Sequence, residues 1–341
     1  MDSSAQPLTE HHDVALLDLD GVVYLGEEPI AGAPQALAAA RERGLRLAFV
    51  TNNASRTPAQ VADLLSRMGV PARPEEVITS AQAAAHDLAD RLPAGARVLV
   101  LGTDALRSAV AERGLVPVAS ADDGPAAVVQ GFSRQLGWPE LAEGAVAIRQ
   151  GAFWLATNLD ATVPSPRGRL PGNGALIAAL SHAVGFTPPA TGKPDPTMHR
   201  ESVERAGARR PIVVGDRLDT DIEGARRVGC PSLLVLTGVS TPAELLAAPP
   251  EQRPDYLGAD LTALTSPHPQ TRVDSDVVRC NAATVRRVGS RLELSGGSNR
   301  LDALRALAVA AWQGDPKVRI NGVDEDSRRV LDELGLADSS A

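Results

Sequence analysis

Two carboxylates stand one residue apart in the segment Asp18-Leu19-Asp20-Gly21. On an exposed loop two such charges repel each other, so a divalent cation that neutralises them would explain why both are present. Beside that cation, Asp18 can act as a nucleophile toward phosphorus and Asp20 can give a proton to the leaving oxygen. Gly21 lets the backbone N–H groups of the loop approach a phosphate closely. The segment alone fits a turn with two solvated acids equally well.

Thr51 and Lys193 offer the donors that a phosphoryl group requires. Thr51 supplies a hydroxyl and, together with Asn52 and Asn53, backbone N–H groups. Lys193 is one of only two lysines in the chain, and its compact positive charge suits a small oxyanion. Each site also has a plain structural alternative, which is a polar turn or helix cap at Thr51 and an exposed lysine before a helix at Lys193.

A third acidic group, Asp216, Asp219 and Asp221, falls within six residues. Carboxylate oxygens are the ligands that Mg²⁺ prefers, and metal ligands are held by further polar groups behind them. Ligands and supporting partners of one cation explain this group better than solvation does. The structural alternative is a helix N-terminus, which also favours acidic residues.

Asp18, Thr51 and Asp216 each follow a short apolar run, whereas Lys193 precedes a predicted helix. Such runs alternate with helical patterns along the chain, which indicates parallel sheets covered on both faces. The clearest helix has its apolar stripe at Val61, Leu64, Leu65 and Met68, after Thr57-Pro58 and before Gly69. We therefore expect an α/β protein with a doubly wound, Rossmann-like parallel sheet and its functional residues in the loops after the strands. The predicted strands are Val14–Leu17, Leu45–Val50, Arg97–Leu101, Ala127–Val129, Phe153–Ala156, Ile212–Val214 and Leu233–Leu236.

In this order, the polar groups resemble the four motifs of the haloacid dehalogenase superfamily of phosphatases. The segment Asp18-Leu19-Asp20-Gly21-Val22 is similar to the first motif, Thr51-Asn52-Asn53 to the second, and Lys193 to the third. The fourth resembles Gly215-Asp216-Arg217-Leu218-Asp219-Thr220-Asp221-Ile222, and the resemblance covers about residues 14–264.

The resemblance implies a role for each residue. Asp18 would be the nucleophile that forms an aspartyl phosphate, and Asp20 would act first as acid and then as base. Mg²⁺ would be bound by Asp18, the backbone carbonyl of Asp20 and Asp216, with Asp221 supporting them. The phosphate would be bound by Gly21, Thr51, Asn52, Asn53 and Lys193.

The spacing of the motifs predicts an inserted domain. Only 32 residues separate Asp18 from Thr51, whereas 141 separate Thr51 from Lys193, and a plain crossover needs only about 30. We expect the core to be formed by 13–92 and 188–265, with an α/β cap of the C2 type at 93–187. Such a cap excludes water from the site and selects the substrate.

The cap also bears on the substrate. The segments 156–160, 171–174 and 236–241 resemble the branch that contains NagD-like nucleotide, phosphoglycolate, glycerol phosphate and pyridoxal phosphate phosphatases. Relatives selective for pyridoxal phosphate carry a histidine where this chain has Val163, and this short aliphatic residue, with Arg167 and Arg169 nearby, favours a small polyol or acid phosphate. Asp160, Val163 and Arg167 are the expected substrate residues of the cap loop. Glycerol 3-phosphate is the first expectation and phosphoglycolate the second. Arg167 also fits a solvated turn residue.

Beyond a predicted linker at 266–272, residues 273–338 form a small α+β domain in our interpretation. Its predicted order, β-β-α-β-α, resembles an acetyltransferase-like domain fused to a phosphatase of this branch. The segment Arg287-Val288-Gly289-Ser290 is a poor pyrophosphate loop, so a packing or regulatory role is expected. An acyl-transferring or acyl-coenzyme A-binding tail is the alternative. A catalytically silent regulator is a third hypothesis, which the presence of both Asp18 and Asp20 disfavours.

The net charge and the cysteine content bear on which partners the protein binds and in which compartment it works. A formal net charge of -8 disfavours general binding to nucleic acid or to an anionic membrane surface. The two cysteines, Cys230 and Cys280, lack the spacing of a metal or redox motif, and the first twelve residues lack the features of a signal peptide. We therefore predict a cytoplasmic enzyme that acts on a small phosphate ester, with a homo-oligomer through the cap as a possible assembly.

Overall fold

The computed structural model describes residues 1–26, 28–163, 167–314 and 318–337. The chain divides into two compact units. Unit 1 consists of Met1–Leu25, Pro29–Leu47 and Ala208–Ala341, and unit 2 consists of Gly26–Glu28 and Ala48–Gly207. The first and fourth motifs therefore belong to unit 1, whereas Thr51 and Lys193 belong to unit 2.

The core of unit 1 is a parallel sheet with the strand order β14-β13-β12-β1. Its strands are short apolar runs buried on both faces, which is why they show no alternation of polar and apolar residues. Beside β1 lies the beginning of β4, whose first residue Arg46 donates its N–H to the Asp13 carbonyl over 3.2 Å. The bounds are Val14–Leu17 for β1, Arg46–Thr51 for β4, Pro211–Gly215 for β12, Ser232–Val235 for β13 and Tyr256–Gly258 for β14.

Short helices connect these strands. The predicted strands that correspond to β1, β4, β12 and β13 are confirmed to within a residue at most ends, while the three-residue β14 was not predicted. The remaining elements of this core are α1 (Leu8–His11), β2 (Tyr24–Leu25), β3 (Glu28–Pro29), α2 (Ala33–Glu42), the π-helix η3 (Leu218–Ile222), α9 (Glu223–Arg227), α10 (Pro242–Ala247), and the 3-10 helices η4 (Pro250–Gln252) and η5 (Leu261–Thr265).

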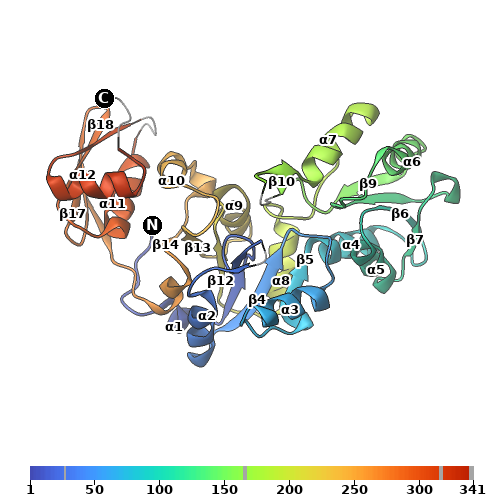
Figure 1. Cartoon of the computed structure of the whole chain (residues 1–341), viewed down its shortest axis with the longest axis horizontal. Coiled ribbons are helices and arrows are strands. Elements are labelled where there is room, and N and C mark those ends of the chain that lie inside the picture. Colours follow the sequence, from blue (N-terminus) through green and yellow to red (C-terminus); the bar gives the residue numbers. More distant parts are fainter. Residues whose placement is uncertain (27, 164–166, 315–317, 338–341) are drawn as a thin grey trace. The chain divides into compact units, whose positions relative to one another are not determined.

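Unit 1 also contains the C-terminal sheet, ordered β15-β16-β17-β18-β19 (Figure 1). The predicted order β-β-α-β-α is present from β17 onward, but β15 and β16 precede it and were missed. Both have only four residues. β15 is largely exposed and lacks an apolar pattern, whereas β16 is mostly apolar and buried but too short to stand out in the sequence. The bounds are β15 Thr271–Asp274, β16 Val277–Cys280, β17 Ala283–Val288, β18 Arg291–Ser295, α11 Arg300–Ala311, β19 Arg319–Gly322 and α12 Glu325–Glu333.

Unit 2 is built around a four-stranded parallel sheet with the order β7-β6-β8-β9. Leu99 and Leu101 of β6 pack under α6 and α7, while Val98 and Val100 pack under α4 and α5. Alternate residues of one strand thus face opposite helix layers, as expected for a sheet covered on both faces. The bounds are α4 Ser80–Arg91, β6 Arg97–Leu101, α5 Asp104–Glu112, β7 Val116–Val118, β8 Ala127–Gln130, α6 Trp138–Arg149, β9 Phe153–Ala156 and α7 Asn173–Val184.

The same unit holds the part of β4 that pairs in parallel with β5. The helix predicted from Val61, Leu64, Leu65 and Met68 is α3, and Thr57 caps it as expected by accepting the Gln60 N–H. The predicted cap, 93–187, lies within unit 2 and stays a prediction as a separate domain. The remaining bounds are α3 Pro58–Arg67, η1 Pro74–Glu76, β5 Val77–Thr79, η2 Ala121–Asp123, β10 Thr162–Val163, β11 Leu170–Pro171 and α8 Pro196–Arg205.

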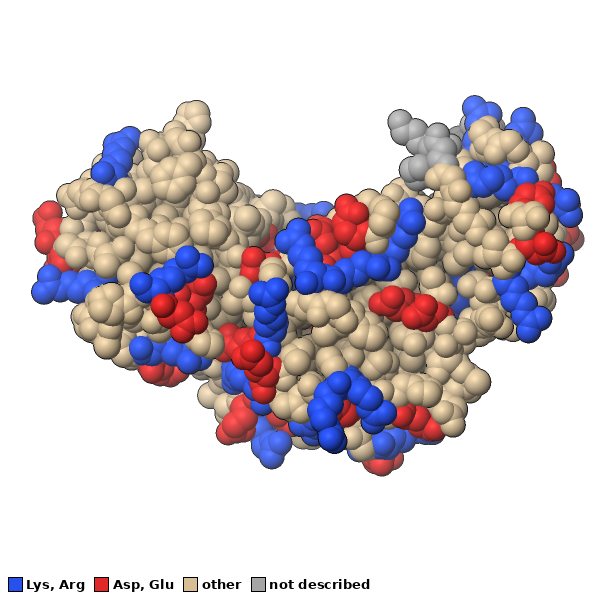
Figure 2. Space-filling view, turned by 180° about the vertical axis from the view of Figure 1, so that it is seen from behind, with Lys and Arg blue, Asp and Glu red and all other residues tan. Residues whose placement is uncertain are grey.

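Charged side chains of both signs are interspersed on the face shown in Figure 2. The net charge of -8 is therefore not collected there into a field of one sign. Among the described residues, no helix combines the length and apolar character needed to cross a bilayer.

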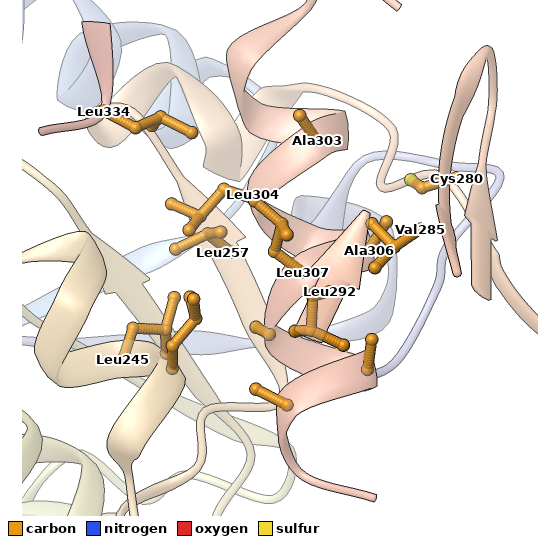
Figure 3. Packing of buried hydrophobic residues seen from close by; sticks show 14 of the residues in the cluster. Leu245, Leu257, Cys280, Val285, Leu292, Ala303, Leu304, Ala306, Leu307 and Leu334 are labelled. Atoms are coloured by element: carbon orange, nitrogen blue, oxygen red, sulfur yellow. The ribbon is translucent and has the colours of Figure 1, made fainter. Parts of the chain in front are cut away.

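A single hydrophobic cluster joins the C-terminal sheet to the core of unit 1 (Figure 3). Leu304 and Leu307 of α11 are fully buried in it together with Leu245 of α10 and Leu257 of β14. Polar contacts reinforce the junction, because the Trp312 indole N–H donates to the Leu245 carbonyl over 3.0 Å. The apolar face of α11 thus packs against the core of unit 1.

Candidate active site

The first motif begins where β1 ends. The Asp18 N–H donates to the Val214 carbonyl over 2.9 Å, which continues the pairing of β1 with β12 by one residue. The chain then turns at Gly21, whose φ of 95° lies in the left-handed region that favours glycine. The Gly21 N–H donates to the Tyr24 carbonyl over 2.8 Å and closes the turn. Asp18 and Asp20 are half-buried on this loop.

Asp18, Asp216 and Asp221 come together in unit 1. One carboxylate oxygen from each lies within 4.8 Å of those of the other two. Asp216 and Asp221 are buried, and the Asp221 carboxylate also accepts the N–H of Arg217 over 3.2 Å. Three carboxylates gathered around one point fit a hard divalent cation such as Mg²⁺, whose positive charge would offset their mutual repulsion.

Asp219 differs from its two acidic neighbours. Its side chain is more than half exposed and forms a salt bridge with Arg217, with 2.9 Å between the atoms. For this residue the alternative of a solvated acid therefore holds. Asp219 and Asp221 stand two residues apart in the π-helix η3, and residues at that spacing in a helix do not face the same side.

The Asp216 carboxylate lies between two glycine backbones. A Cβ atom on Gly21 or on Gly238 would overlap its Oδ2 atom. The same Oδ2 accepts the Val239 N–H over 2.6 Å, and the Thr237 hydroxyl donates to the Gly21 carbonyl over 2.6 Å. The segment 236–241 served only as a resemblance to one branch of the family, and its contact with Asp216 was not predicted from the sequence. Its signal was a polar, glycine-containing turn directly after a buried strand.

In unit 2, Asn52 holds the backbone of Lys193. Its Oδ1 accepts the Lys193 N–H over 2.8 Å, and its Nδ2 donates to the Lys193 carbonyl over 3.1 Å. The Lys193 side chain is buried, and its ammonium donates to the Val50 carbonyl over 3.2 Å. Because the second and third motifs are bound to each other in this way, Lys193 is no exposed lysine before a helix.

The loop after β4 is ordered by its own side chains. Thr51 is buried, and its hydroxyl oxygen accepts the Asn53 N–H over 3.1 Å. The Asn52 carbonyl accepts bonds from the Ser80 hydroxyl over 2.5 Å and from the Asn158 amide over 2.7 Å. These contacts tie the predicted phosphate-binding loop to two other segments of unit 2.

The three predicted cap residues have different environments. Asp160 accepts hydrogen bonds from the Asn52 amide over 3.2 and 3.3 Å, which links it directly to the second motif. Val163 lies in β10, opposite Leu170 of β11. Arg167 is exposed. The structure therefore brings Asp160 into contact with Asn52 of the second motif.

His199 was not among the predicted site residues. It lies on α8 and is buried, and neither ring nitrogen has a hydrogen-bond partner in the part of the chain that the structure describes. Burial and the nearby charge of Lys193 lower the pKa of His199 to about 3. The ring is therefore neutral at pH 7 and adds no second positive charge beside Lys193.

Comparison with known proteins agrees with these features. A family model described as haloacid dehalogenase-like hydrolase matches residues 15–116, and a HAD-hydrolase-like model matches residues 190–264. Residues 280–336 match a model of a GCN5-related N-acetyltransferase like domain.

Relatives cover almost the whole chain. A D-glycerol 3-phosphate phosphatase of Mycobacterium tuberculosis is 46% identical over 96% of each chain. A crystal structure of glycerol phosphate phosphatase from that organism, in complex with magnesium, is 44% identical, with a TM-score of 0.89 over 97% of this chain and 99% of that one. An acid sugar phosphatase of Staphylococcus aureus is 40% identical over 66% of this chain and 87% of its own length.

The chain belongs to the haloacid dehalogenase-like hydrolases. Within that family it is a phosphatase, and the predicted enzyme class is confirmed. The predicted fold class and the acetyltransferase-like character of the C-terminal domain are confirmed as well.

Proposed function

We propose that this phosphatase uses Mg²⁺ to hydrolyse glycerol 3-phosphate to glycerol and inorganic phosphate. The observation that carries the proposal is the meeting of Asp18, Asp216 and Asp221 within 4.8 Å on a chain that has all four motifs of the family. The near full-length similarity to a D-glycerol 3-phosphate phosphatase supports the choice of ester.

In the proposed mechanism the Asp18 carboxylate attacks phosphorus, and the bond from phosphorus to the glycerol oxygen breaks. Asp20 donates a proton to that oxygen, so glycerol leaves as a neutral alcohol. Asp20 then takes a proton from water as the water attacks the aspartyl phosphate, which releases phosphate and regenerates Asp18. Mg²⁺ held by Asp18, the Asp20 carbonyl and Asp216 would supply positive charge to the phosphoryl oxygens, with Asp221 supporting these ligands.

Thr51, Asn52, Asn53 and Lys193 have the proposed task of holding the phosphoryl group, together with the Gly21 loop. A buried ammonium and backbone N–H groups stabilise an oxyanion well because the surrounding protein excludes water. Asn52 is hydrogen-bonded to both the N–H and the carbonyl of Lys193. These bonds support the role, because they fix the backbone from which the Lys193 side chain extends.

Residues 93–187 are proposed to act as the cap that selects the alcohol part of the ester. Val163 stands where relatives selective for pyridoxal phosphate carry a histidine, so the cap of this chain would lack that histidine. Asp160 accepts a hydrogen bond from Asn52, which links the cap residues to the second motif. Phosphoglycolate is the second candidate, ahead of pyridoxal phosphate and nucleotides.

A phosphate-release screen tests the substrate. Purified full-length protein with Mg²⁺ is given glycerol 3-phosphate, phosphoglycolate, pyridoxal 5′-phosphate and a nucleoside monophosphate. We expect kcat/KM to be highest for glycerol 3-phosphate by at least about ten-fold, which corresponds to about 1.4 kcal/mol of transition-state discrimination. Comparable values for all four esters would contradict the proposed substrate, and a higher value for phosphoglycolate would replace it.

The C-terminal domain, 273–338, is proposed to pack on the core rather than to transfer an acyl group. The shared hydrophobic cluster supports this role. The Gly296 N–H, in the glycine-rich turn before α11, donates to the Asp324 carboxylate over 2.8 Å, and Asn299 caps the first N–H groups of α11. Calorimetric binding of acetyl-coenzyme A to the full-length protein would contradict this proposal.

The last part of the proposal concerns the cellular location of the enzyme and its partners. A reducing cytoplasm is supported by two cysteines that are both free. We propose further that the protein does not bind nucleic acid, which the negative net charge supports, and that copies associate through residues 93–187 if the enzyme is oligomeric.

A further inference from the structure

We infer that Thr237 is a positioning residue of the metal site, because its hydroxyl fixes the Gly21 backbone and thereby the ligands on either side of it. The inference rests on the proposed function, which assigns Mg²⁺ to Asp18, the Asp20 carbonyl and Asp216. Thr237 lies 216 residues after Gly21 in the chain, and its hydroxyl donates to the Gly21 carbonyl over 2.6 Å.

The Asp20 carbonyl belongs to the same peptide group as the Gly21 N–H. In a planar trans peptide these two groups point in opposite directions. The bond from the Gly21 N–H to the Tyr24 carbonyl therefore directs the Asp20 carbonyl away from Tyr24.

The second peptide group of Gly21 needs a restraint of its own. Glycine has more backbone freedom than any other residue, and here its φ is 95°. The Thr237 hydroxyl supplies the restraint by binding the Gly21 carbonyl. Both peptide groups of Gly21 are then fixed, one by the Tyr24 carbonyl and one by Thr237.

The segment that contains Thr237 also contacts the Asp216 carboxylate. Gly238 follows Thr237 in the chain, and a Cβ on either Gly238 or Gly21 would overlap the Asp216 carboxylate. The next N–H, that of Val239, donates to Asp216 Oδ2 over 2.6 Å. The Thr237 bond thus ties together the two backbone segments that flank the Asp216 carboxylate.

Threonine suits this position because its branched Cβ restricts the χ1 angle, so the hydroxyl loses little freedom when it binds. Groups that orient metal ligands typically contribute about ten-fold or more to metal affinity. The expected consequence of losing the hydroxyl is weaker Mg²⁺ binding, with the ester-binding groups of unit 2 unaltered.

The test measures Mg²⁺ binding to the full-length protein by titration calorimetry without substrate. Thr237→Val removes the hydroxyl and keeps the shape, Thr237→Ala removes it with less bulk, and Thr237→Ser restores it. Thr241→Val is the matched control, since it removes a hydroxyl that caps the nearby α10 through the Glu244 N–H and does not contact Gly21. We expect the Kd for Mg²⁺ to rise about ten-fold in the Val and Ala variants at position 237, and to stay within about two-fold in the other two.

Thermal melts identify any variant that does not fold. If Thr237→Val does not fold, the Mg²⁺ affinity of Thr237→Ala decides the test. In turnover assays the loss should appear in the Mg²⁺ concentration for half-maximal rate, with KM for glycerol 3-phosphate within about two-fold of wild type. Unchanged Mg²⁺ affinity without the hydroxyl would overturn the inference, as would an equal loss in Thr241→Val. If wild type released no phosphate from any ester, only the proposed function would fail, because Mg²⁺ binding is measured without turnover.

Discussion

Asp18 is the residue on which the proposed chemistry depends, because the proposal makes it both a metal ligand and the nucleophile. A carboxylate can fill both roles, because one of its oxygens can bind the cation while the other attacks phosphorus. Its backbone is fixed by the bond to Val214, so a small change in the side chain should leave the loop in place.

Asp18→Asn should therefore fold normally and lose turnover by at least about 10³-fold, since an amide is a poor nucleophile. Asp219→Asn is the matched control, because Asp219 is in the same acidic segment as Asp216 but pairs with Arg217 at the surface. We expect the control to keep turnover within about two-fold. Phosphate release by mass-verified, non-deamidated protein is the measurement, and substantial residual turnover in Asp18→Asn would exclude the covalent mechanism.

The three clustered carboxylates also predict the response to calcium. Ca²⁺ takes six to eight oxygen ligands at longer distances than Mg²⁺, so it should bind the same acids but place Asp18 poorly for in-line attack. We expect Ca²⁺ to inhibit in competition with Mg²⁺ and not with the ester. Turnover at fixed ester and rising Ca²⁺, repeated at several Mg²⁺ concentrations, tests this, and calcium-supported turnover at the magnesium rate would argue against it.

At the scale of elements, α8 carries the buried His199 and follows Lys193, a proposed phosphate-binding residue. Asp195 begins it, because its carboxylate accepts the Thr197 N–H over 2.9 Å. Lys193 precedes the helix, and His199 is buried on it. The helix therefore brings a buried imidazole close to the buried ammonium of Lys193.

The lowered pKa of His199 makes stability depend on pH. A histidine in the unfolded chain titrates near 6.5, whereas His199 in the folded protein titrates near 3. Between these values the unfolded state binds the additional proton, so the free energy of unfolding must fall as pH falls from 7 toward 3. From pH 7 to pH 5 this one group should cost about 2 kcal/mol.

His199→Leu should remove that part of the pH dependence. Urea unfolding at pH 7 and pH 5 gives the loss for each protein, and we expect a loss smaller by about 2 kcal/mol in the variant. His182→Leu, which changes an exposed histidine of α7, should behave like wild type. An equal loss in His199→Leu and wild type would show that His199 is accessible to protons in the folded state.

At the scale of the whole molecule, the C-terminal domain and the core of unit 1 share one hydrophobic cluster. Separate domains joined by a linker would each bury their own apolar residues, whereas here Leu304 and Leu307 are buried together with Leu245 and Leu257 (Figure 3). Arg305 adds a buried hydrogen bond to the Leu257 carbonyl over 2.6 Å. The domain is thus part of the core's packing.

Leu304→Ala should lower the free energy of unfolding by about 2 to 5 kcal/mol, because it leaves a cavity in this cluster. Val288→Ala, at an exposed position of β17, is the control and should change it by less than about 0.5 kcal/mol. Turnover per folded molecule should stay near wild type in both. Truncation near Pro267 should likewise lower the melting temperature or cause aggregation, and a truncated protein with an unchanged melting temperature would contradict the shared core.

The sequence by itself determined the features that depend on near neighbours. Continuous apolar runs specified the strands of four or more residues in the parallel sheets, Thr57 and Gly69 marked the ends of α3, and Asp18, Asp20 and Gly21 became recognisable once the four motifs were taken together in their order. Only the tertiary structure placed Asp216 and Asp221 against Asp18, bound Asn52 to Lys193, brought the Thr237 hydroxyl to the Gly21 carbonyl, and buried His199 near Lys193. These contacts join residues far apart in the chain, or depend on burial, and a local pattern carries no information about either. The two four-residue strands β15 and β16 were also missed, because β15 is exposed and defined by its pairing with β16, while the apolar run of β16 is short.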